Sequence, residues 1–230
     1  MHSYWQTTKH PWPCLMIVLP LLGFYEWCMH YEANCGVQPL RAGLDAWLGD
    51  ALLLINWQLP YLPSMMVGFV CISWAVLRWD RSPPESLTTI LGIILESLLY
   101  ALALWALAVL VATHLQQMGI ATRSMKAVAF VGSGIFEEVL FRLLGFGLLF
   151  WLFKNVAQDR TALVVAMLLS SVGFALAHYI GPQGEGWDWR TAAFRSLAGL
   201  SFACLFHFRG LGIAVGTHAA YNLLVGLVRY

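Results

Sequence analysis

Residues 87–112 read LTTILGIILESLLYALALWALAVLVA, an apolar run that contains one charged side chain, Glu96. A helix needs roughly 17 to 25 predominantly apolar residues to cross the hydrocarbon core of a bilayer. The run meets that length, so it predicts a transmembrane helix. The same criterion divides the rest of the chain.

Six further apolar windows are long enough to span a bilayer. They run near residues 11–30, 60–79, 126–153, 161–180, 192–208 and 211–228. Of all residues, 60% are hydrophobic and only 11% are charged, whereas a soluble domain averages about 25% charged residues. The chain therefore lacks the charged surface of a water-soluble protein. We predict an all-α fold, a polytopic transmembrane helical bundle of about seven to eight spans.

The segment between the first two windows has an amphipathic pattern. Apolar residues recur there at helical spacing, and charged residues occupy the other faces: Leu40, Leu44, Trp47, Leu48 and Leu52 against Arg41, Asp45 and Asp50. This pattern predicts an interfacial helix within about residues 31–59. A short extra span is the alternative.

Local signals mark several helix ends. Ser82-Pro83-Pro84-Glu85 predicts a helix start, with Ser82 as the N-cap. The window at 126–153 is longer than a perpendicular span needs, so we expect it to tilt or to project from the membrane. A Gly-rich break at 181–186 should place His178 near a helix end. Gly212 and Gly216 form a GxxxG pattern, which predicts that the last helix packs inside the bundle.

Charge and cysteine usage restrict the possible partners. The formal net charge is +1 and no basic block is present, so we predict no nucleic-acid partner, because nothing would neutralise the phosphates. The five cysteines form no CxxC pair and show no metal-ligand spacing: Cys14, Cys28, Cys35, Cys71 and Cys204. We predict free thiols, with a Cys28–Cys35 disulfide in an oxidising loop as the alternative.

Three short motifs place polar side chains inside the later apolar windows. They are Glu137-Glu138-Val139-Leu140-Phe141-Arg142, Phe174-Ala175-Leu176-Ala177-His178 and His218-Ala219-Ala220-Tyr221-Asn222. An ionisable group in hydrocarbon costs roughly 2.5 to 3.5 kcal/mol even on the lenient insertion scale. Six such polar groups at helical spacings are therefore difficult to explain by structure alone, and they indicate an active site.

In the first motif, Glu138 and Arg142 are four residues apart and can form an ion pair on one helix face. Glu137 points about 100° away from Glu138 on that helix and has no charge partner in the motif. A structural ion-pair network would explain the pair but not the second glutamate. We therefore interpret Glu137 as a candidate general base.

The other two motifs each place two side chains on one helix face, Phe174 beside His178 and His218 beside Asn222. A lone histidine in a membrane helix is usually a helix-helix hydrogen-bonding residue, and we interpret His207, beside Arg209, as interfacial. Together with the glutamates, however, the imidazoles and carboxamide can activate water and donate to an oxyanion. That combination suits hydrolysis of an amide bond. The same groups could hold zinc, although HExxH is absent.

In these motifs the chain resembles the CAAX protease and bacteriocin-processing family of intramembrane proteases, which includes the type II CAAX prenyl endopeptidases. The family pattern is EExxxR, then FxxxH, then HxxxN or HxxxD, and the ordered set is quite specific. The resemblance covers about residues 85–228. It implies a helical core that encloses a polar intramembrane cavity.

The resemblance also implies a role for each motif residue. Glu137 would activate water with help from His178, while His218 and Asn222 would stabilise the oxyanion. Glu138 and Arg142 would brace the site, and Phe174 would pack beside His178. We predict no cofactor. If zinc is used instead, its ligands would be Glu137, His178 and His218.

On this basis we predict a peptide hydrolase that cuts a hydrophobic or membrane-tethered peptide near or within the bilayer. We expect a multi-pass protein of the bacterial inner (plasma) membrane type. Residues 1–84 would supply N-terminal membrane helices and the interfacial segment, and residues 85–230 the catalytic core, within one integrated domain. The alternatives are a non-catalytic scaffold or immunity protein that binds hydrophobic peptides, and a proton-coupled transporter. Polar residues strung across the bilayer and internal repeats, which a transporter would favour, are absent from the sequence.

Overall fold

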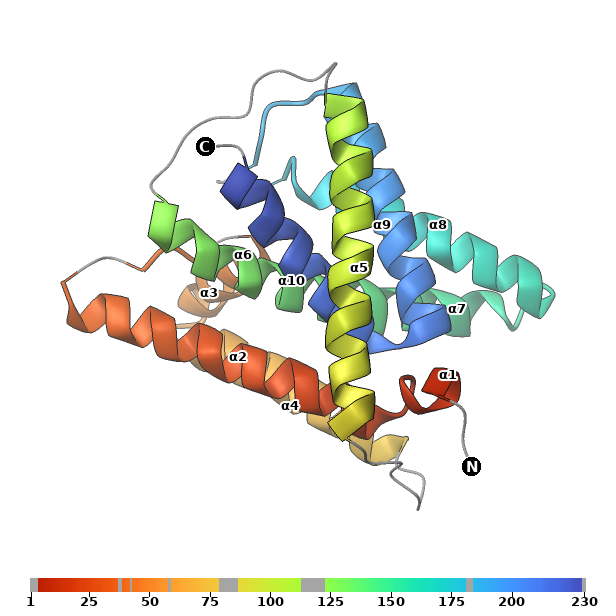
Figure 1. Ribbon diagram of the computed structural model, residues 1–230, viewed down its shortest axis with the longest axis horizontal. Coiled ribbons are helices and arrows are strands. Elements are labelled where there is room, and N and C mark those ends of the chain that lie inside the picture. Colours follow the sequence, from red (N-terminus) through yellow and green to blue (C-terminus); the bar gives the residue numbers. More distant parts are fainter. Residues whose placement is uncertain are drawn as a thin grey trace.

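A computed structural model describes residues 4–36, 39–41, 43–57, 59–78, 87–112, 123–180 and 184–228. All regular structure in these ranges is helical (Figure 1). The helices are α1 (Tyr4–Thr7), α2 (Pro11–Asn34), α3 (Leu44–Leu54), α4 (Leu62–Leu77), α5 (Leu87–Ala112), α6 (Arg123–Glu138), the π-helix η1 (Val139–Phe146), α7 (Gly147–Phe153), α8 (Asp159–Ala177), α9 (Trp189–Arg209) and α10 (Leu211–Val228). The predicted all-α class is confirmed.

Each predicted apolar window coincides with helix. Within the described residues, α2, the Leu87–Leu110 part of α5, α8 and α9 are long and apolar enough to cross a membrane. The apolar helix α4 and the Leu211–Gly226 part of α10 are shorter. The window at 126–153 lies within three helices that follow one another without a break, α6, η1 and α7. The fold is thus that of a multi-pass helical membrane bundle, and the number of spans stays a prediction.

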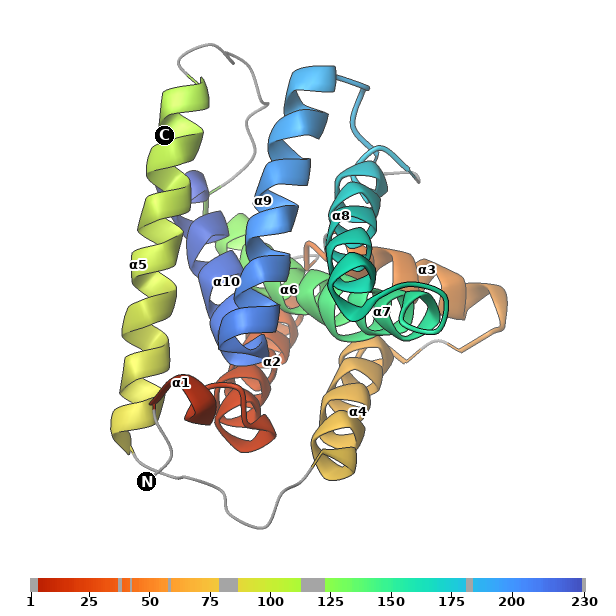
Figure 2. The same ribbon diagram turned by 90° about the vertical axis from the view of Figure 1, so that its right-hand side faces the viewer.

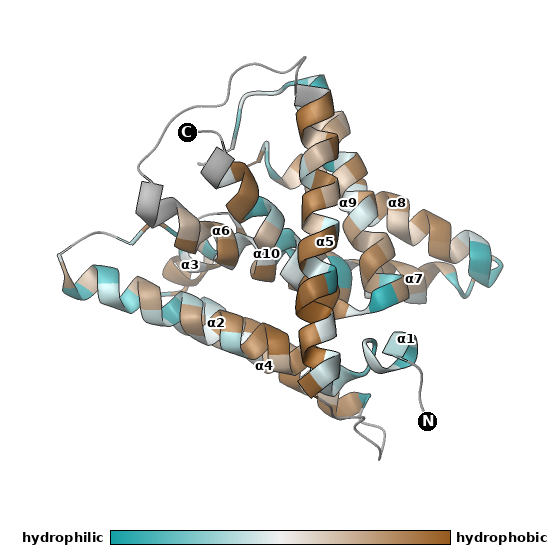
Figure 3. Cartoon of the chain, viewed as in Figure 1, coloured by the Kyte–Doolittle hydropathy of each residue, from teal (hydrophilic) through white to brown (hydrophobic). Residues whose placement is uncertain are grey.

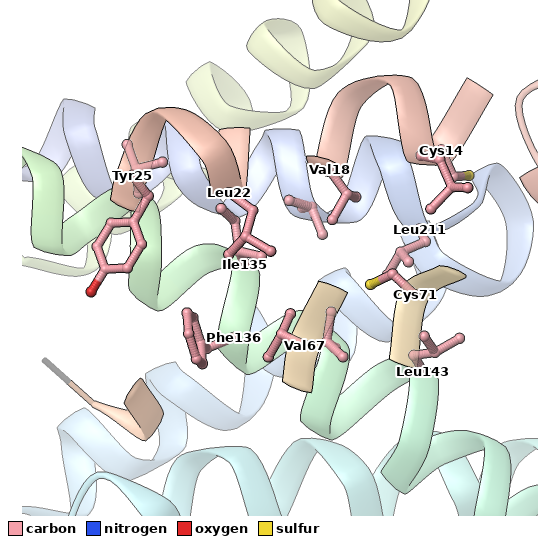
Figure 4. Packing of buried hydrophobic residues seen from close by; sticks show 14 of the residues in the cluster. Cys14, Val18, Leu22, Tyr25, Val67, Cys71, Ile135, Phe136, Leu143 and Leu211 are labelled. Carbon is pink, nitrogen blue, oxygen red and sulfur yellow. The ribbon is translucent and has the colours of Figure 1, made fainter. Parts of the chain in front are cut away.

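Apolar side chains cover the outside of the bundle as well as its interior. On α5 the leucines at 91, 95, 98, 99 and 102 are all exposed, and Figure 3 shows this helix hydrophobic along most of its length. An exposed apolar surface of this extent marks a membrane-facing region. Inside, α2, α4, α6, η1 and α10 share a core that includes Val18, Val67, Ile135 and Leu143 (Figure 4).

Helix α10 lies at the centre of the bundle and packs against α2, α5, α6 and α9 (Figures 1 and 2). Small residues allow these approaches. A Cβ at Gly216 would lie 2.6 Å from Ser97 Oγ on α5, and one at Gly134 of α6 would lie 2.8 Å from the Ala219 backbone nitrogen of α10. The prediction that the last helix packs inside the bundle is confirmed.

Helix α9 has well-defined ends. Asp188 is its N-cap and accepts a hydrogen bond from the Thr191 backbone N–H at 2.9 Å. Gly210 ends the helix at φ +102°, a conformation that favours glycine, and a Cβ there would lie 2.6 Å from the Thr8 carbonyl oxygen. The turn into α10 therefore packs directly on the N-terminal segment.

The amphipathic segment contains helix α3, whose 11 residues are too short to span a bilayer. The alternative of an extra span is therefore wrong. Asp45 also departs from expectation: it is fully buried rather than exposed on a polar face. The cause is that Arg41 Nη1 donates to its carboxylate at 2.7 Å and the Tyr25 hydroxyl donates to the same oxygen. Burial raises the pKa of Asp45.

Two predictions concern segments at the margin of the described residues. The predicted helix start at Ser82-Pro83-Pro84-Glu85 lies outside them. Helix α8 ends at Ala177, with His178 as its C-cap, so His178 does lie at a helix end.

All five cysteines are free thiols in the structure.

Candidate active site

The glutamate motif lies where α6 becomes the π-helix η1. Glu137 and Glu138 are the last two residues of α6, and Arg142 lies inside η1. A π-helical turn leaves a backbone carbonyl without its ordinary helical partner, and such turns are frequent at functional sites. Here the Ser170 hydroxyl of α8 donates to the Phe141 carbonyl oxygen at 2.6 Å. This bond ties the irregular turn to the neighbouring helix.

Glu138 is fully buried and links two motifs. Its Oε1 accepts a hydrogen bond from His218 Nδ1 at 2.8 Å. Its Oε2 lies 3.3 Å from Arg142 Nε, close enough for an ion pair although not aligned for a hydrogen bond. The predicted Glu138–Arg142 pair is therefore present, and it extends to the imidazole on α10.

Arg142 is fully buried and contacts two neighbouring helices, α8 and α9. Its Nη2 donates to the Gly199 carbonyl oxygen of α9 at 3.1 Å. Its guanidinium carbon lies 4.5 Å from the centre of the Phe174 ring on α8 and 5.5 Å from that of Phe202 on α9. Such cation–π contacts stabilise a desolvated cation. The arginine thus holds η1 against α8 and α9.

His218 stands between the two carboxylates. Because Nδ1 donates to Glu138, the opposite nitrogen, Nε2, faces Glu137 and lies 3.7 Å from its Oε2. The ring stacks on Phe202, with centroids 4.3 Å apart and planes 17° apart. Phe174 meets the same ring edge-on, with centroids 5.7 Å apart. Two aromatic rings and a carboxylate therefore fix the imidazole's orientation.

Glu137 uses its two oxygens differently. Oε1 accepts a hydrogen bond from the Ser133 hydroxyl, one helical turn earlier. Oε2 makes no hydrogen bond to any residue that the structure describes. One oxygen is thus held in place while the other is left free to accept a proton.

His178 and Asn222 are each held by a backbone carbonyl. His178 Nδ1 donates to the Phe174 carbonyl oxygen at 2.9 Å, so in the neutral ring Nε2 carries the free lone pair. Asn222 Nδ2 donates to the Phe130 carbonyl oxygen of α6 at 3.3 Å, and its second N–H remains for another acceptor. Both side chains are oriented before any ligand binds.

A cavity of about 470 Å³ joins these groups. Its walls come from α3, α6, η1, α8, α9, α10 and the segment before α9. Glu137, His178, His218 and Asn222 all line it, and so does Phe174. Glu138 and Arg142 do not line it, and lie behind His218 instead. The structure thus brings all six predicted polar residues together, in two layers.

Several residues of the site were not singled out in the sequence. Ser133 precedes Glu137 by four residues, and this helical spacing was a usable signal. Phe202, Gly199 and Phe130 contribute a ring or a carbonyl across helix interfaces, which no local pattern reveals. The wall from α3, with Trp47, and the cation Arg195 on α9 were missed for the same reason.

A zinc site would use Glu137, His178 and His218 as ligands. No group of three or more His, Cys, Asp or Glu side chains converges as a metal site within the described residues. Glu137 and His218 approach each other, but His178 does not complete a ligand set with them. In that part of the chain, Glu137, His178 and His218 are therefore not gathered as one ligand set, and whether a cofactor is used stays a prediction.

Comparison with known families identifies one match. Residues 119–224 match the family model described as Type II CAAX prenyl endopeptidase Rce1-like. All three motifs lie inside the matched range, so the resemblance predicted from them is confirmed. The match supports CAAX-type intramembrane protease activity. No curated protein and no solved structure matches the chain.

Proposed function

We propose that this chain, whose residues 119–224 carry the match to the CAAX protease family, is an intramembrane endopeptidase that uses a water activated by glutamate and histidine. The observation that supports this proposal best is the convergence of Glu137, His178, His218 and Asn222 on one cavity. Phenylalanine side chains form much of its walls, which suits a hydrophobic or membrane-tethered peptide.

Glu137 activates the water, with help from His178. The free Oε2 of Glu137 accepts a proton as the water oxygen attacks the scissile carbonyl carbon. The unprotonated Nε2 of neutral His178 accepts the second hydrogen bond of the same water and orients it. A positioned base of this kind contributes about 100- to 10,000-fold in rate.

Oxyanion stabilisation falls to His218 and Asn222. Nδ1–H of His218 is already donated to Glu138, so Nε2 can donate only when the ring is doubly protonated. Two carboxylates beside the ring, at 2.8 and 3.7 Å, supply the countercharge for that imidazolium. The second N–H of Asn222 donates from the same helix face. The peptide C–N bond then breaks, Glu137 returns its proton to the leaving amine, and a carboxylic acid and an amine result.

Glu138 and Arg142 act behind the cavity. Glu138 sets which nitrogen of His218 faces the substrate, and Arg142 neutralises Glu138. Phe174 separates Arg142 from the cavity and contacts both histidines. These residues are positioning residues, because they act through His218 and His178.

The test is Glu137→Gln, measured as cleavage of a membrane-tethered peptide by the purified protein in liposomes. Glutamine keeps the volume and accepts the Ser133 hydrogen bond but cannot take a proton from water. We expect turnover to fall by about 100- to 10,000-fold with the thermal unfolding midpoint unchanged. The matched control is Glu32→Gln, because Glu32 lies outside the cavity lining. Unchanged turnover in Glu137→Gln would refute the role of this residue.

Three further measurements test the mechanism and its alternatives. Asn222→Ala should lower turnover by about 100- to 1000-fold with little change in substrate binding, as loss of one oxyanion donor does.

Activity should survive a membrane-permeant chelator. Zinc-restored activity after chelation would instead assign water activation to a metal. A wild-type protein that binds peptides without cutting them would support the scaffold alternative.

A further inference from the structure

The cavity contains a cation that the hydrolysis does not use. Arg195 lies in the N-terminal half of α9 and lines the cavity. Its side chain is 13% exposed. Among the described residues that line the cavity, it is the only lysine or arginine. A cation that is largely withdrawn from water needs an anionic partner.

The partner that Arg195 has is an exposed one. Its Nη2 donates to Glu185 Oε1 at 2.7 Å, and the Glu185 side chain is 44% exposed. Its Nη1 makes no hydrogen bond to any described residue. The guanidinium also lies over the Tyr179 ring at 5.5 Å, which fixes its plane. Arginine has five N–H donors in a planar fork, so most of its capacity remains unused.

The other acid at this end of the cavity is already committed. Asp188 caps α9 by accepting from the Thr191 hydroxyl at 2.6 Å and from its backbone N–H at 2.9 Å. These hydrogen bonds lower the pKa of Asp188. The Asp188 carboxylate is therefore occupied by the hydrogen bonds that cap α9. Glu185 remains as the counter-ion of Arg195.

We propose that Arg195 binds a carboxylate of the peptide substrate, which displaces Glu185. This inference rests on the proposed function, because it assigns the substrate chemistry of that cavity. An ion pair whose carboxylate is exposed, as Glu185 is, is weak and easily exchanged. A carboxylate inside the cavity would instead meet a desolvated guanidinium and form two parallel hydrogen bonds. The carboxylate is either the C-terminus of the peptide or an aspartate or glutamate side chain.

The test measures binding without cleavage, so it does not depend on the proposed hydrolysis. The probes are three short fluorescent apolar peptides: one with a free C-terminal carboxylate, one with a C-terminal amide, and an amidated one with an internal aspartate. Binding is measured by fluorescence anisotropy on the detergent-solubilised Glu137→Gln protein. With Arg195 intact, one carboxylate peptide should bind about 10- to 100-fold more tightly than the neutral peptide, as expected for hydrogen bonds to a charged group. The peptide that does so identifies the source.

Arg195→Gln should remove this preference and leave the neutral peptide's affinity unchanged. Glu185→Gln should raise the affinity of the preferred peptide by about two- to fivefold, because a competing anion is gone. Arg190→Gln is the matched control, since Arg190 is exposed and outside the cavity lining, and it should change nothing. With Glu137 restored, Arg195→Gln should raise KM and leave kcat unchanged.

Three results would overturn the proposal: no preference for either carboxylate peptide, an equal effect of Arg195→Gln on charged and neutral peptides, or weaker binding in Glu185→Gln. The last would mean that the ion pair only holds the loop before α9. Any of these results combined with normal cleavage would leave the proposed function standing.

Discussion

Two Glu–Arg pairs in this bundle have different geometries. Glu96 of α5 and Arg209 of α9 form a two-pronged pair: Nη2 lies 2.6 Å from Oε2, and Nε donates to Oε1. Glu138 and Arg142 approach only to 3.3 Å, without hydrogen-bond alignment. In the first pair both carboxylate oxygens bind the arginine, whereas in the second one oxygen remains for His218. A closed pair joins helices, and an open pair can orient a catalytic group.

The surroundings of the two pairs support this distinction. Arg209 lies 3.7 Å from the Trp5 ring centre, and the Tyr4 hydroxyl donates to Glu96 at 2.9 Å. These contacts attach the N-terminal segment to the turn between α9 and α10. None of the four residues lines the cavity. The Glu96–Arg209 pair is therefore a matched structural control for the site.

The largest expected effect comes from Arg142→Ala. It leaves Glu138 buried without its cation, and breaking a buried pair from one side costs about 3 to 5 kcal/mol. We expect the unfolding midpoint and the activity both to fall. Arg209→Ala should lower stability less, because Glu96 is 17% exposed and can be hydrated. The folded fraction of the Arg209→Ala protein should keep the wild-type specific activity. Specific activity and the thermal unfolding midpoint are both measured in detergent.

The double variant Arg142→Ala/Glu138→Ala sharpens this comparison. Removing the stranded carboxylate should restore part of the stability but none of the activity, because His218 is then unoriented. If Arg142→Ala melts at the wild-type temperature, the bracing role is wrong.

A smaller effect is expected from Glu138→Gln. The amide keeps the volume but supplies no countercharge to His218, so we expect turnover to fall by about 100- to 1000-fold, as loss of one oxyanion donor does. Glu96→Gln should leave turnover within about twofold. Turnover per folded molecule, measured for both variants, decides between the roles. Equal losses in the two variants would mean that the pairs do not differ in function.

The two pairs also show what could be predicted from the sequence. Glu138–Arg142 follows from helix geometry alone, because residues four apart share a face. The apolar windows likewise predicted the helices, since the length and composition of a segment determine whether it can cross a bilayer. Glu96 and Arg209 are 113 residues apart, so no local pattern pairs Arg209 with this glutamate. The burial of Arg209 depends on how α5, α9 and the N-terminal segment pack.

The same limit applies to the site. The three motifs identified the polar residues of four helices because each motif is local. The sequence could not reveal that Phe202 stacks on His218, that Gly199 accepts from Arg142, or that α3 closes the cavity. The π-helix was also missed, because the apolar pattern at 139–146 is compatible with an ordinary helix.

The smallest effect is expected from Ser133→Ala. This variant tests whether Glu137 depends on the neutral hydroxyl donor Ser133, in the way that Glu138 depends on the cation Arg142. The Ser133 hydroxyl holds Oε1 of Glu137, and a hydrogen bond of this kind contributes roughly 0.5 to 1.5 kcal/mol. We expect kcat to fall by about two- to tenfold with KM unchanged, and Ser133→Thr to retain activity. The control is Ser201→Ala, which removes a hydrogen bond within α9 from the Ser201 hydroxyl to the Leu197 carbonyl oxygen at 3.0 Å. If Ser133→Ala changes neither kcat nor its pH profile, Glu137 does not need the Ser133 hydroxyl to hold its carboxylate. The two adjacent glutamates would then differ in whether their function depends on a bonding partner.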